Sequence, residues 1–229
     1  RHEAWENLAR KLAHEIKNPL TPIQLTIDKL KSKYSEKIAE HEKNDFSKSL
    51  LIIGKQIKQI ENLVNEFSDF ARMPKPILKD NNLVSLIKDN IKLTGELDSE
   101  IAINFKLNKP EVLLNSDSEQ LSRVFLNLLK NAIESVQEKK IDNDNFAGKI
   151  DVTLNENEEN INFIIVDNGL GFGILADNIK NILNPYFTTK KKGTGLGLAI
   201  VNKIINDHNG KINFIPLEDG AKIEIIFTR

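Results

Sequence analysis

A histidine beside a glutamate, His14–Glu15, is a pair of residues that could do chemistry together. An imidazole has an unperturbed pKa of about 6.5, so its neutral form is available as a nucleophile near pH 7. The neighbouring carboxylate could accept a proton from the ring. Pro19 and Pro22 follow in "HEIKNPLTPIQL", and each weakens a helix because proline lacks the backbone N–H. We therefore predict a helix that bends or loosens just beyond His14, and the histidine is either a reactive group or a solvated surface side chain.

Two long amphipathic helices are expected to hold this pair, because apolar residues recur at steps of three and four. The two apolar stripes comprise Leu8, Leu12, Ile16, Leu20, Ile23, Ile27 and Leu30, and then Phe46, Leu50, Ile53, Ile57, Ile60, Val64, Phe67 and Ala71. Residues 35–45 are polar and predict a turn. At about 100° per residue, His14 points away from the first stripe and should be exposed. The histidines outside any motif are interpreted as solvated: His2, His41 and His208.

A hairpin of two such helices has more apolar surface than it can cover by itself. We therefore predict a homodimer in which two hairpins form a four-helix bundle. Pro74 and Pro76 cannot continue the second helix, so we place a domain boundary there. The expected domains are residues 1–74 and residues 75–229.

The pattern after the boundary mixes helices and strands. Alternating apolar residues predict strands at residues 101–107, 111–115, 148–156, 160–167, 211–215 and 221–227, and helical periodicity predicts helices at residues 82–93 and 116–140. This order is typical of an α/β sandwich in which helices cover one face of a mixed sheet. The whole chain is thus expected to be of the α+β class, with a helical hairpin followed by the sandwich.

The helix expected at residues 116–140 has two distinct faces. Ser116 and Glu119 match a capping box at its start. The buried stripe would consist of Leu121, Val124, Phe125, Leu128, Leu129, Ala132, Ile133 and Val136. Asn127, Asn131 and Glu134 fall on another line, at i, i+4 and i+7. Asparagine is a mediocre helix former, so amides on one line suggest a ligand, although asparagines on helix surfaces are common.

Two glycine-rich segments follow this helix. In "FIIVDNGLGF", Asp167 ends a strand, and Gly169 and Gly171 remove side chains where a group must approach the backbone, unless the segment is a plain turn. In "KKKGTGLGLAIVNKII", glycines lead into an amphipathic helix, for which Gly210 is the expected C-cap. Backbone N–H groups at such a helix start bind anions, and the preceding lysines add positive charge. The pattern indicates a phosphorylated ligand.

Composition narrows the classes of function. The formal net charge is −1, which argues against a general nucleic-acid-binding surface. The chain has no cysteine, so disulfides and thiolate metal sites are excluded. No apolar run is long enough to cross a bilayer. The chain begins with Arg1 rather than methionine, and we interpret it as a fragment of a longer protein that could hold a membrane anchor elsewhere.

Five motifs in sequence order carry a resemblance to a known family. "HEIKNPL", "NLLKNAIES", "DNGLGF", "NPYFTTK" and "KGTGLGLAIV" closely resemble the successive boxes of sensor histidine kinases of two-component systems, and the nitrogen-regulation group in particular. The resemblance spans nearly the whole chain. It implies that residues 1–74 form the dimerisation and histidine phosphotransfer domain. Residues 75–229 would be the catalytic ATP-binding domain, of the Bergerat (GHKL) fold shared with gyrase-type ATPases.

The resemblance also implies roles for residues of the first domain. His14 matches the phospho-acceptor and Glu15 the acid that takes up the ring proton. Asn18 matches the residue that helps to orient water when the partner regulator is dephosphorylated. The phosphoryl group would pass from His14 to an aspartate in the receiver domain of an NtrX-like response regulator. Full-length relatives carry membrane and sensory segments upstream, so the chain would be the cytoplasmic part of a bacterial inner-membrane protein.

In the second domain the resemblance implies ATP and Mg²⁺. Asn131 matches the Mg²⁺ ligand, Asp167 the acceptor for the adenine amino group, and Gly169 and Gly171 the residues beside the base. The other residues of the nucleotide site, its lid and its phosphate loop would be Asn127, Lys130, Glu134, Tyr186, Phe187, Lys190, Lys192, Gly193, Thr194, Gly195, Leu196, Gly197 and Leu198. Gyrase-type ATPases carry a catalytic glutamate where this chain has Asn127. An amide cannot act as a general base, so rapid ATP hydrolysis is not expected.

Two other interpretations remain beside an ATP-dependent protein histidine kinase. The chain could be mainly a phosphatase or scaffold for a response regulator, and Asn18 suits both activities. A Ser/Thr kinase or chaperone-type ATPase of the same fold conflicts with Asn127 and with the helix around His14. Phe172 stands where the family usually has a smaller aliphatic residue, which concerns only the local packing of its loop.

Overall fold

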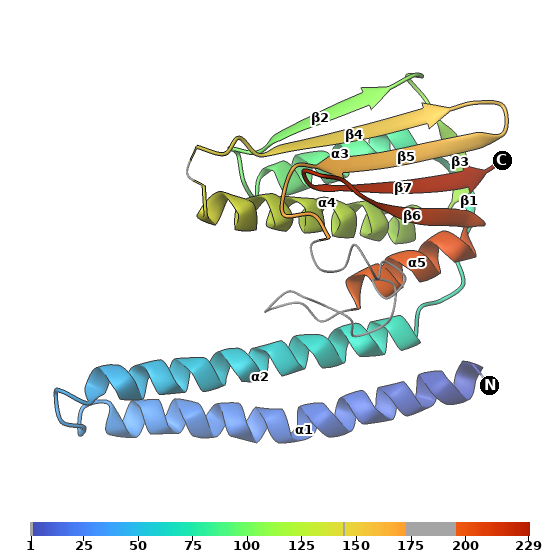
Figure 1. Cartoon of the computed structure of the whole chain (residues 1–229). Coiled ribbons are helices and arrows are strands. Elements are labelled where there is room, and N and C mark those ends of the chain that lie inside the picture. The colour runs from blue at the N-terminus through green and yellow to red at the C-terminus, as the bar shows by residue number, and fades with distance from the viewer. Residues whose placement is uncertain (1, 144, 173–195) are drawn as a thin grey trace. The chain divides into compact units, whose positions relative to one another are not determined.

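The structure is a computed structural model of the chain, and it describes residues 2–143, 145–172 and 196–229. Contacts between residues divide the chain into two compact units. One unit extends from the N-terminus to Pro74, and the other begins at Lys75. Each unit has its own apolar interior, and the elements of both are labelled in Figure 1.

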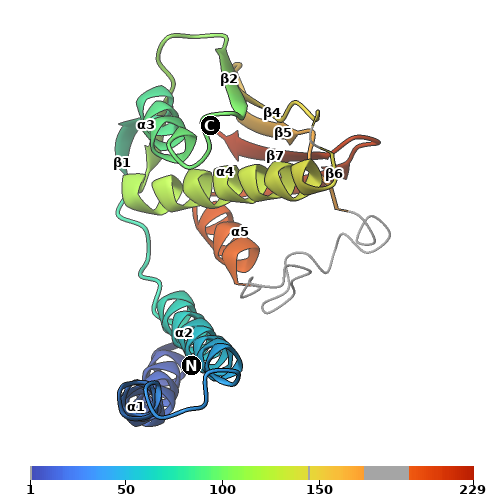
Figure 2. The ribbon, with the colours of Figure 1, turned by 90° about the vertical axis from the view of Figure 1, so that its left-hand side faces the viewer.

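The first unit is a helical hairpin. Its helices are α1 (His2–Tyr34) and α2 (Lys43–Ala71), which lie side by side in Figures 1 and 2. Helix α1 continues through Pro19 and Pro22, and Figure 1 shows its axis changing direction about half-way along. The point of weakness expected beyond His14 is therefore a bend in a continuous helix rather than a break.

The hairpin covers only part of its two apolar stripes. Leu20 and Ile27 of α1 pack with Phe46, Leu50 and Ile57 of α2. Several other large side chains of the stripes are substantially exposed, namely Leu12 at 39%, Ile16 at 41%, Ile23 at 44%, Ile53 at 45% and Ile60 at 41%, whereas Val64 is buried and Phe67 is half-buried. One hairpin thus leaves a second apolar seam open along each helix, as expected if another pair of helices covers it. The homodimer itself stays a prediction.

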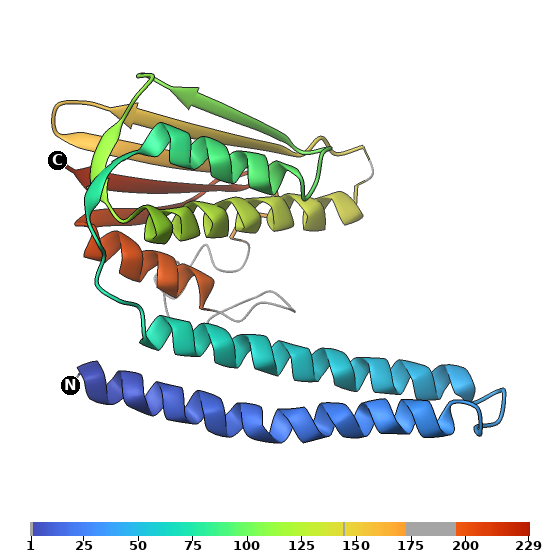
Figure 3. The ribbon, with the colours of Figure 1, turned by 180° about the vertical axis from the view of Figure 1, so that it is seen from behind.

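The second unit contains a five-stranded sheet with the strand order β2-β4-β5-β7-β6. The strands are β2 (Ala102–Leu107), β4 (Lys149–Glu156), β5 (Asn160–Asp167), β6 (Gly210–Pro216) and β7 (Ala221–Thr228). Only the β2–β4 pair is parallel, and the other three pairs are antiparallel. Figures 2 and 3 show helices α3 (Leu83–Gly95), α4 (Ser118–Ile141) and α5 (Gly197–Asp207) together on one face of the sheet. The predicted α+β architecture is confirmed.

The core of this unit lies between α4 and the sheet. All eight residues of the stripe predicted on α4 are buried. The rings of Phe125 on α4 and Phe163 on β5 lie 4.8 Å apart between centroids. Burial alternates along β5 and β7 because successive strand residues point to opposite faces of the sheet. The strand that ends at Asp167 is therefore held on its two edges by β4 and β7 and on one face by α4.

A short additional sheet and the start of α4 differ from the predictions. Strand β1 (Lys79–Asn82), which the sequence pattern did not reveal, pairs with β3 (Leu113–Ser116). The predicted capping box is wrong, because Ser116 is the last residue of β3 and its hydroxyl donates to the carbonyl of Leu114. Asp117 is the N-cap instead, and its Oδ1 accepts the backbone N–H groups of Glu119 and Gln120 at 3.1 and 3.0 Å.

The C-terminal end of α5 also differs. Helix α5 ends at Asp207, and Asn209 takes the left-handed conformation, with a φ of 55°, that was expected of Gly210. Gly210 is the first residue of β6, and a Cβ there would lie 2.9 Å from Ile205 and 3.0 Å from Phe227. Close packing therefore accounts for this glycine.

His208 is buried, with 7% of its surface exposed, so its interpretation as a solvated side chain is wrong.

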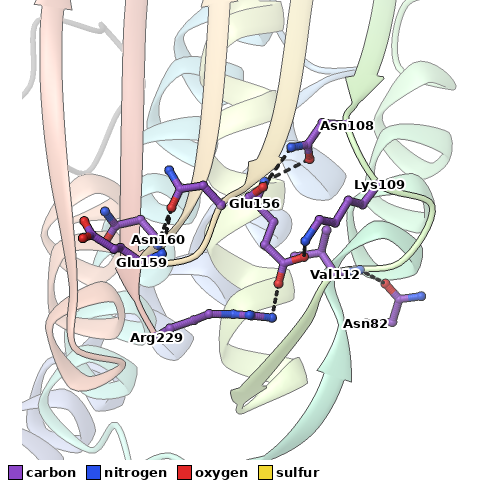
Figure 4. A network of polar contacts seen from close by, with 9 residues as sticks. Asn82, Asn108, Lys109, Val112, Glu156, Glu159, Asn160 and Arg229 are labelled. Carbon is purple, nitrogen blue, oxygen red and sulfur yellow. Dashed lines mark hydrogen bonds and ion pairs between the residues drawn. The ribbon is translucent and has the colours of Figure 1, made fainter.

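A buried carboxylate joins the chain's last residue to the sheet (Figure 4). The carboxylate of Glu156, at the end of β4, pairs with Lys109 at 2.8 Å and with Arg229. Its backbone exchanges two hydrogen bonds with the side chain of Asn108, at 2.9 and 3.0 Å. These contacts hold three segments together at the end of the sheet where β5 begins. Asp167 is at the opposite end of the sheet, where β5 ends.

Candidate functional site

The predicted phospho-acceptor lies on the exposed side of α1. His14, Glu15 and Asn18 are all exposed. At about 100° per residue, His14 lies more than 90° around the helix from Leu20 and Ile27, which contact α2. The imidazole is therefore accessible from solvent, as the sequence predicted.

The charged surroundings of His14 come from its own helix. Glu15 lies 3.9 Å from the ammonium of Lys11, one turn earlier, and its side chain is 59% exposed. An exposed pair at this distance contributes little energy, about 0.3–0.5 kcal/mol for this spacing on a helix. Glu15 is thus free to change its partner at small cost, which a proton acceptor for a neighbouring ring needs.

In the second unit, Asp167 ends strand β5 and is 7% exposed. Its Oδ1 accepts the backbone N–H of Gly169 at 2.9 Å, which closes a tight turn after the strand. A carboxylate at such a strand end is an acceptor in a low-exposure environment. It is suited to bind a donor such as an exocyclic amino group.

The glycines after Asp167 are explained by packing within the protein. A Cβ at position 169 would come within 2.5 Å of the backbone of Ser135 on α4. Gly171 has a φ of 69°, and a Cβ there would lie 2.6 Å from the carbonyl oxygen of Gly220. Gly220 in turn has a φ of 104° and no room for a Cβ beside the carbonyl of Asp167. Protein backbone thus occupies the Cβ direction at both glycines, and their place beside a base stays a prediction.

Helix α4 presents its second line of polar residues beside the start of α5. Asn127 and Asn131 are half-buried, whereas Lys130 and Glu134 are exposed. A Cβ at Gly197 would lie 3.7 Å from Oδ1 of Asn127. Leu198 is half-buried and Leu196 is buried. The structure therefore brings the end of the glycine-rich motif next to the amide line of α4.

The remaining predicted residues of the nucleotide site lie outside the described residues. They are Tyr186, Phe187, Lys190, Lys192, Gly193, Thr194 and Gly195.

Phe172, which departs from the family pattern, packs edge-to-face on Phe214 of β6 with ring centroids 6.0 Å apart.

Sequence reasoning missed Ser135, Gly220 and Lys139, which hold the loop after Asp167. Gly220 was visible only as part of a turn, and nothing in the sequence distinguishes Lys139 from a surface lysine.

The described oxygen groups fit a nucleotide with Mg²⁺. Within residues 2–143, 145–172 and 196–229, no cluster of three or more His, Asp or Glu side chains could hold a metal ion alone. Mg²⁺ usually takes one or two protein ligands and completes its shell with phosphate oxygens and water, so a single amide such as Asn131 suffices. Asp167, at the end of β5, offers an acceptor for the base.

A cavity of about 330 Å³ lies elsewhere in the second unit. Its lining includes Leu78, Leu113, His208 and Thr228. Thr228 pairs with Asn160 at the start of β5, whereas Asp167 at the end of β5 pairs with Ala221. The cavity is therefore at the opposite end of the strands from Asp167 and contains none of the predicted site residues.

Comparison with protein families divides the chain in the same order as its motifs. Residues 4–76 match the His Kinase A (phospho-acceptor) domain. Residues 116–228 match the family of histidine kinase-, DNA gyrase B- and HSP90-like ATPases. The chain belongs to the histidine kinase family. None of the helices among the described residues of this histidine kinase chain has the length and hydropathy of a membrane span.

Curated relatives of this histidine kinase chain include NtrY and NtrY-like sensor kinases. It is 39% identical to an NtrY-like sensor histidine kinase of Rickettsia prowazekii over 225 residues, which is 98% of this chain and 36% of the relative. It is 37% identical to the nitrogen regulation protein NtrY of Azorhizobium caulinodans over 227 residues, which is 98% of this chain and 29% of the relative. The chain thus spans about a third of the length of these relatives.

Solved histidine kinases share the fold. The catalytic domain of the histidine kinase ThkA superposes with a TM-score of 0.57 at 28% identity, covering 66% of this chain and 95% of that domain. ThkA in complex with the response regulator protein TrrA gives a TM-score of 0.67 at 25% identity, covering 97% of this chain and 61% of that chain. The resemblance seen in the motifs therefore extends to the structure.

Proposed function

We propose that this chain is the ATP-dependent kinase core of a two-component sensor. Residues 1–74 would carry the phospho-acceptor His14, and residues 75–229 would bind ATP. The observation that carries the proposal is the exposed pair His14–Glu15, off the face of α1 that packs on α2, in a chain whose other unit belongs to the ATPase family named above. The phosphoryl group would pass from His14 to an aspartate in the receiver domain of a response regulator.

The transfer needs one nucleophile and one proton acceptor. The unprotonated nitrogen of the neutral His14 ring attacks the γ-phosphorus of ATP, and the bond from that phosphorus to the bridging oxygen of ADP breaks. The ring nitrogen that carries hydrogen then loses its proton to Glu15. The products are a phosphoramidate on His14, ADP and a protonated Glu15 carboxyl that returns its proton to water.

The second unit would supply positioning and charge neutralisation. Asp167 would accept a hydrogen bond from the adenine amino group, and Asn131 would hold a Mg²⁺ that neutralises charge on the phosphate oxygens. Asn127 stands beside Gly197 at the start of α5. Because its amide cannot remove a proton from water, ATP is held without rapid hydrolysis until His14 reacts.

Partners follow from the same proposal. The open apolar seam of Ile16, Ile23, Ile53 and Ile60 supports a homodimer in which two hairpins cover each other. The similarity to NtrY supports a receiver domain of the NtrX type as the phosphate acceptor. Any attachment to a membrane would be made by segments outside this chain.

The test is incubation of the chain with ATP labelled at the γ-phosphate. The wild-type chain should acquire label that is lost in acid and retained in base. His14→Gln should abolish this label and leave ADP affinity nearly unchanged, because His14 and Asp167 belong to different units. His41→Gln, at an exposed histidine in the turn of the hairpin, is the matched control and should keep the label. Label that persists in the His14→Gln protein would overturn the proposal.

A second candidate function is dephosphorylation of the response regulator as the main activity. Asn18 favours it, because this exposed amide lies one turn from His14 and can orient water toward an acyl phosphate. The two functions are distinguished by rates measured on one preparation. A predominant phosphatase would remove phosphate from a phosphorylated receiver domain faster than it labels itself from ATP.

A further inference from the structure

The residue between Asp167 and Gly169 is fixed on every side. The backbone N–H of Asn168 donates to the carbonyl of Lys149 at 3.2 Å, and its Oδ1 accepts the backbone N–H of Lys149 at 2.8 Å. Its Nδ2 donates to the carbonyl of Ala147 at 2.9 Å. These three bonds all lead to the segment that begins β4. They fix Asn168 to the sheet but leave its own carbonyl group to another partner.

That partner is Lys139 of α4. Its ammonium donates to the carbonyl of Asn168 at 3.0 Å and to Oδ1 of Asp219 at 3.0 Å. It also lies 4.8 Å from the centroid of the Phe146 ring. One side chain thus joins α4 to the loop after Asp167 and to the turn between β6 and β7.

The turn that Lys139 reaches is the one that presses on Asp167. Gly220, the residue after Asp219, lies against the carbonyl of Asp167, so closely that a Cβ would come within 1.8 Å of its oxygen. The Asp167–Asn168 peptide therefore packs against the Gly220 turn, and the next peptide, Asn168–Gly169, is held at its carbonyl by the Lys139 ammonium. Movement of either support changes the direction in which the Asp167 carboxylate leaves the strand.

The ordinary role of such a lysine explains only part of this geometry. Lys139 is in the last turn of α4, where a positive charge stabilises the helix dipole. That role needs no specific partner outside the helix. Asp219 is 86% exposed, so its ion pair with Lys139 is weak, whereas Lys139 itself is only 26% exposed. The less exposed bond to the Asn168 carbonyl is the contact that the helix-dipole role leaves unexplained.

We propose that Lys139 is a positioning residue for nucleotide binding, which acts by holding the Asn168 carbonyl and thereby orienting Asp167 toward the adenine base. This inference rests on the proposed function and extends it to a residue outside the family's motifs. Lys139 acts through Asp167. Its contribution to affinity should therefore depend on the presence of the Asp167 carboxylate.

The experiment is a double-mutant cycle that measures ADP affinity by calorimetry. Lys139→Met keeps the apolar stem but removes the ammonium, and it should weaken ADP binding by about two- to tenfold, the usual weight of one hydrogen bond. The same change in an Asp167→Asn background should weaken it by less than about twofold, because the carboxylate to be oriented is gone. Lys139→Arg, which keeps donors and charge, should stay within about twofold of the wild type.

Asp219→Asn is the matched control, because it removes only the exposed ion pair and should leave ADP affinity within about twofold. Thermal unfolding of each variant separates stability from positioning, since a purely structural loss lowers the melting temperature and the ADP affinity alike in both backgrounds. Equal effects of Lys139→Met with and without the Asp167 carboxylate, or no effect on ADP affinity at all, would overturn the inference while leaving the kinase proposal intact. A wild-type chain that fails to bind ADP would overturn both.

Discussion

His208 accepts the backbone N–H of Asp117 through its Nε2 at 3.0 Å, and so joins the end of α5 to the N-cap residue of α4. A backbone N–H can only donate, so Nε2 carries no hydrogen, and Nδ1 donates to the carbonyl of Ile204 at 2.7 Å. Asp117 also accepts the backbone N–H of Ile77 at 2.9 Å, in the segment that precedes β1. A buried histidine and a capping aspartate thus connect three elements of the second unit.

Replacing His208 by phenylalanine should destabilise the protein without removing its chemistry. The change keeps an aromatic ring but leaves the N–H of Asp117 without its acceptor, which costs about 1–3 kcal/mol in the free energy of unfolding. Denaturation by urea measures this loss. His41→Phe places the same ring at an exposed position and should have little effect. Equal stability of the two variants would contradict the structural role of His208.

Replacing Asp167 by asparagine should weaken the binding of ADP. Loss of a charge-assisted hydrogen bond costs about 1.5–3 kcal/mol, which corresponds to roughly ten- to a hundredfold in affinity. Calorimetry with ADP measures the change. Asp80→Asn, on the exposed strand β1, removes a carboxylate that has no contact with the site and serves as the control. An unchanged ADP affinity in the Asp167→Asn protein would count against the pocket.

Substitutions at Glu15 and Asn18 should separate two activities. Glu15→Ala should slow autophosphorylation, by about 10²–10⁴ if general base catalysis has its usual weight. Asn18→Ala should leave autophosphorylation largely intact and reduce dephosphorylation of the regulator, because an amide can orient water but cannot take up a proton.

Both rates would be measured for each variant, with the molecular mass in solution checked by light scattering. Neither side chain is on the stripe of Leu12, Ile16 and Leu20, so both variants should keep the mass of the wild type. If both substitutions depress both rates equally, the division of roles on this helix is wrong.

The stability of the second unit should depend on pH through Glu156. The hydrogen bond from Lys109, reinforced by the charge of Arg229, lowers the pKa of the Glu156 carboxyl below its usual value despite its burial. A carboxyl whose pKa is lower in the folded protein contributes stability above the pKa of the unfolded chain, about 4.3, and loses it as the pH falls through the folded value. Glu156→Gln should therefore lower the melting temperature at pH 7.

The difference in melting temperature between this variant and the wild type should shrink as the pH falls below about 4, because the wild-type carboxyl then also becomes neutral. Glu158→Gln, at an exposed glutamate two residues away, should show no comparable difference at either pH. A gap in melting temperature that stays constant from pH 7 to pH 3 would contradict this account of Glu156.

Elements with strong apolar periodicity could be predicted from the sequence. The stripe of α4 is buried as expected, because a single face of a long helix must cover the sheet. Strand β1 could not be predicted, because "KDNN" has no apolar alternation and forms only by pairing with β3. Ser116 and Asp117 are both good N-caps, and only the pairing of Ser116 in β3 decides between them.

In the candidate site, too, some features could be predicted from the sequence and others could not. The family resemblance of the motifs around His14, Asn131 and Asp167 was enough to assign a role to each, and these roles stay predictions. Their supports were not predictable, because Lys139 and Ser135 act on a loop that is distant in sequence and have the composition of an ordinary helix surface. The reason for Gly169 also required the structure, since loop packing on α4 and close approach of a ligand both favour glycine.

Helix α2 carries two sets of apolar side chains. The packing of the hairpin and the choice of a partner chain could therefore be changed independently. Leu50 and Ile57 contact α1 within one chain, whereas Ile53 and Ile60, each three residues further along α2, are exposed. If two hairpins pair as proposed, a cell that makes several sensors of this family must prevent unlike chains from pairing. We expect changes at Ile53 and Ile60 to alter which chain is accepted as a mate while the hairpin itself keeps its fold. Insulation between paralogous signalling pathways could thus evolve, or be engineered, at positions that do not affect the hairpin's own interior.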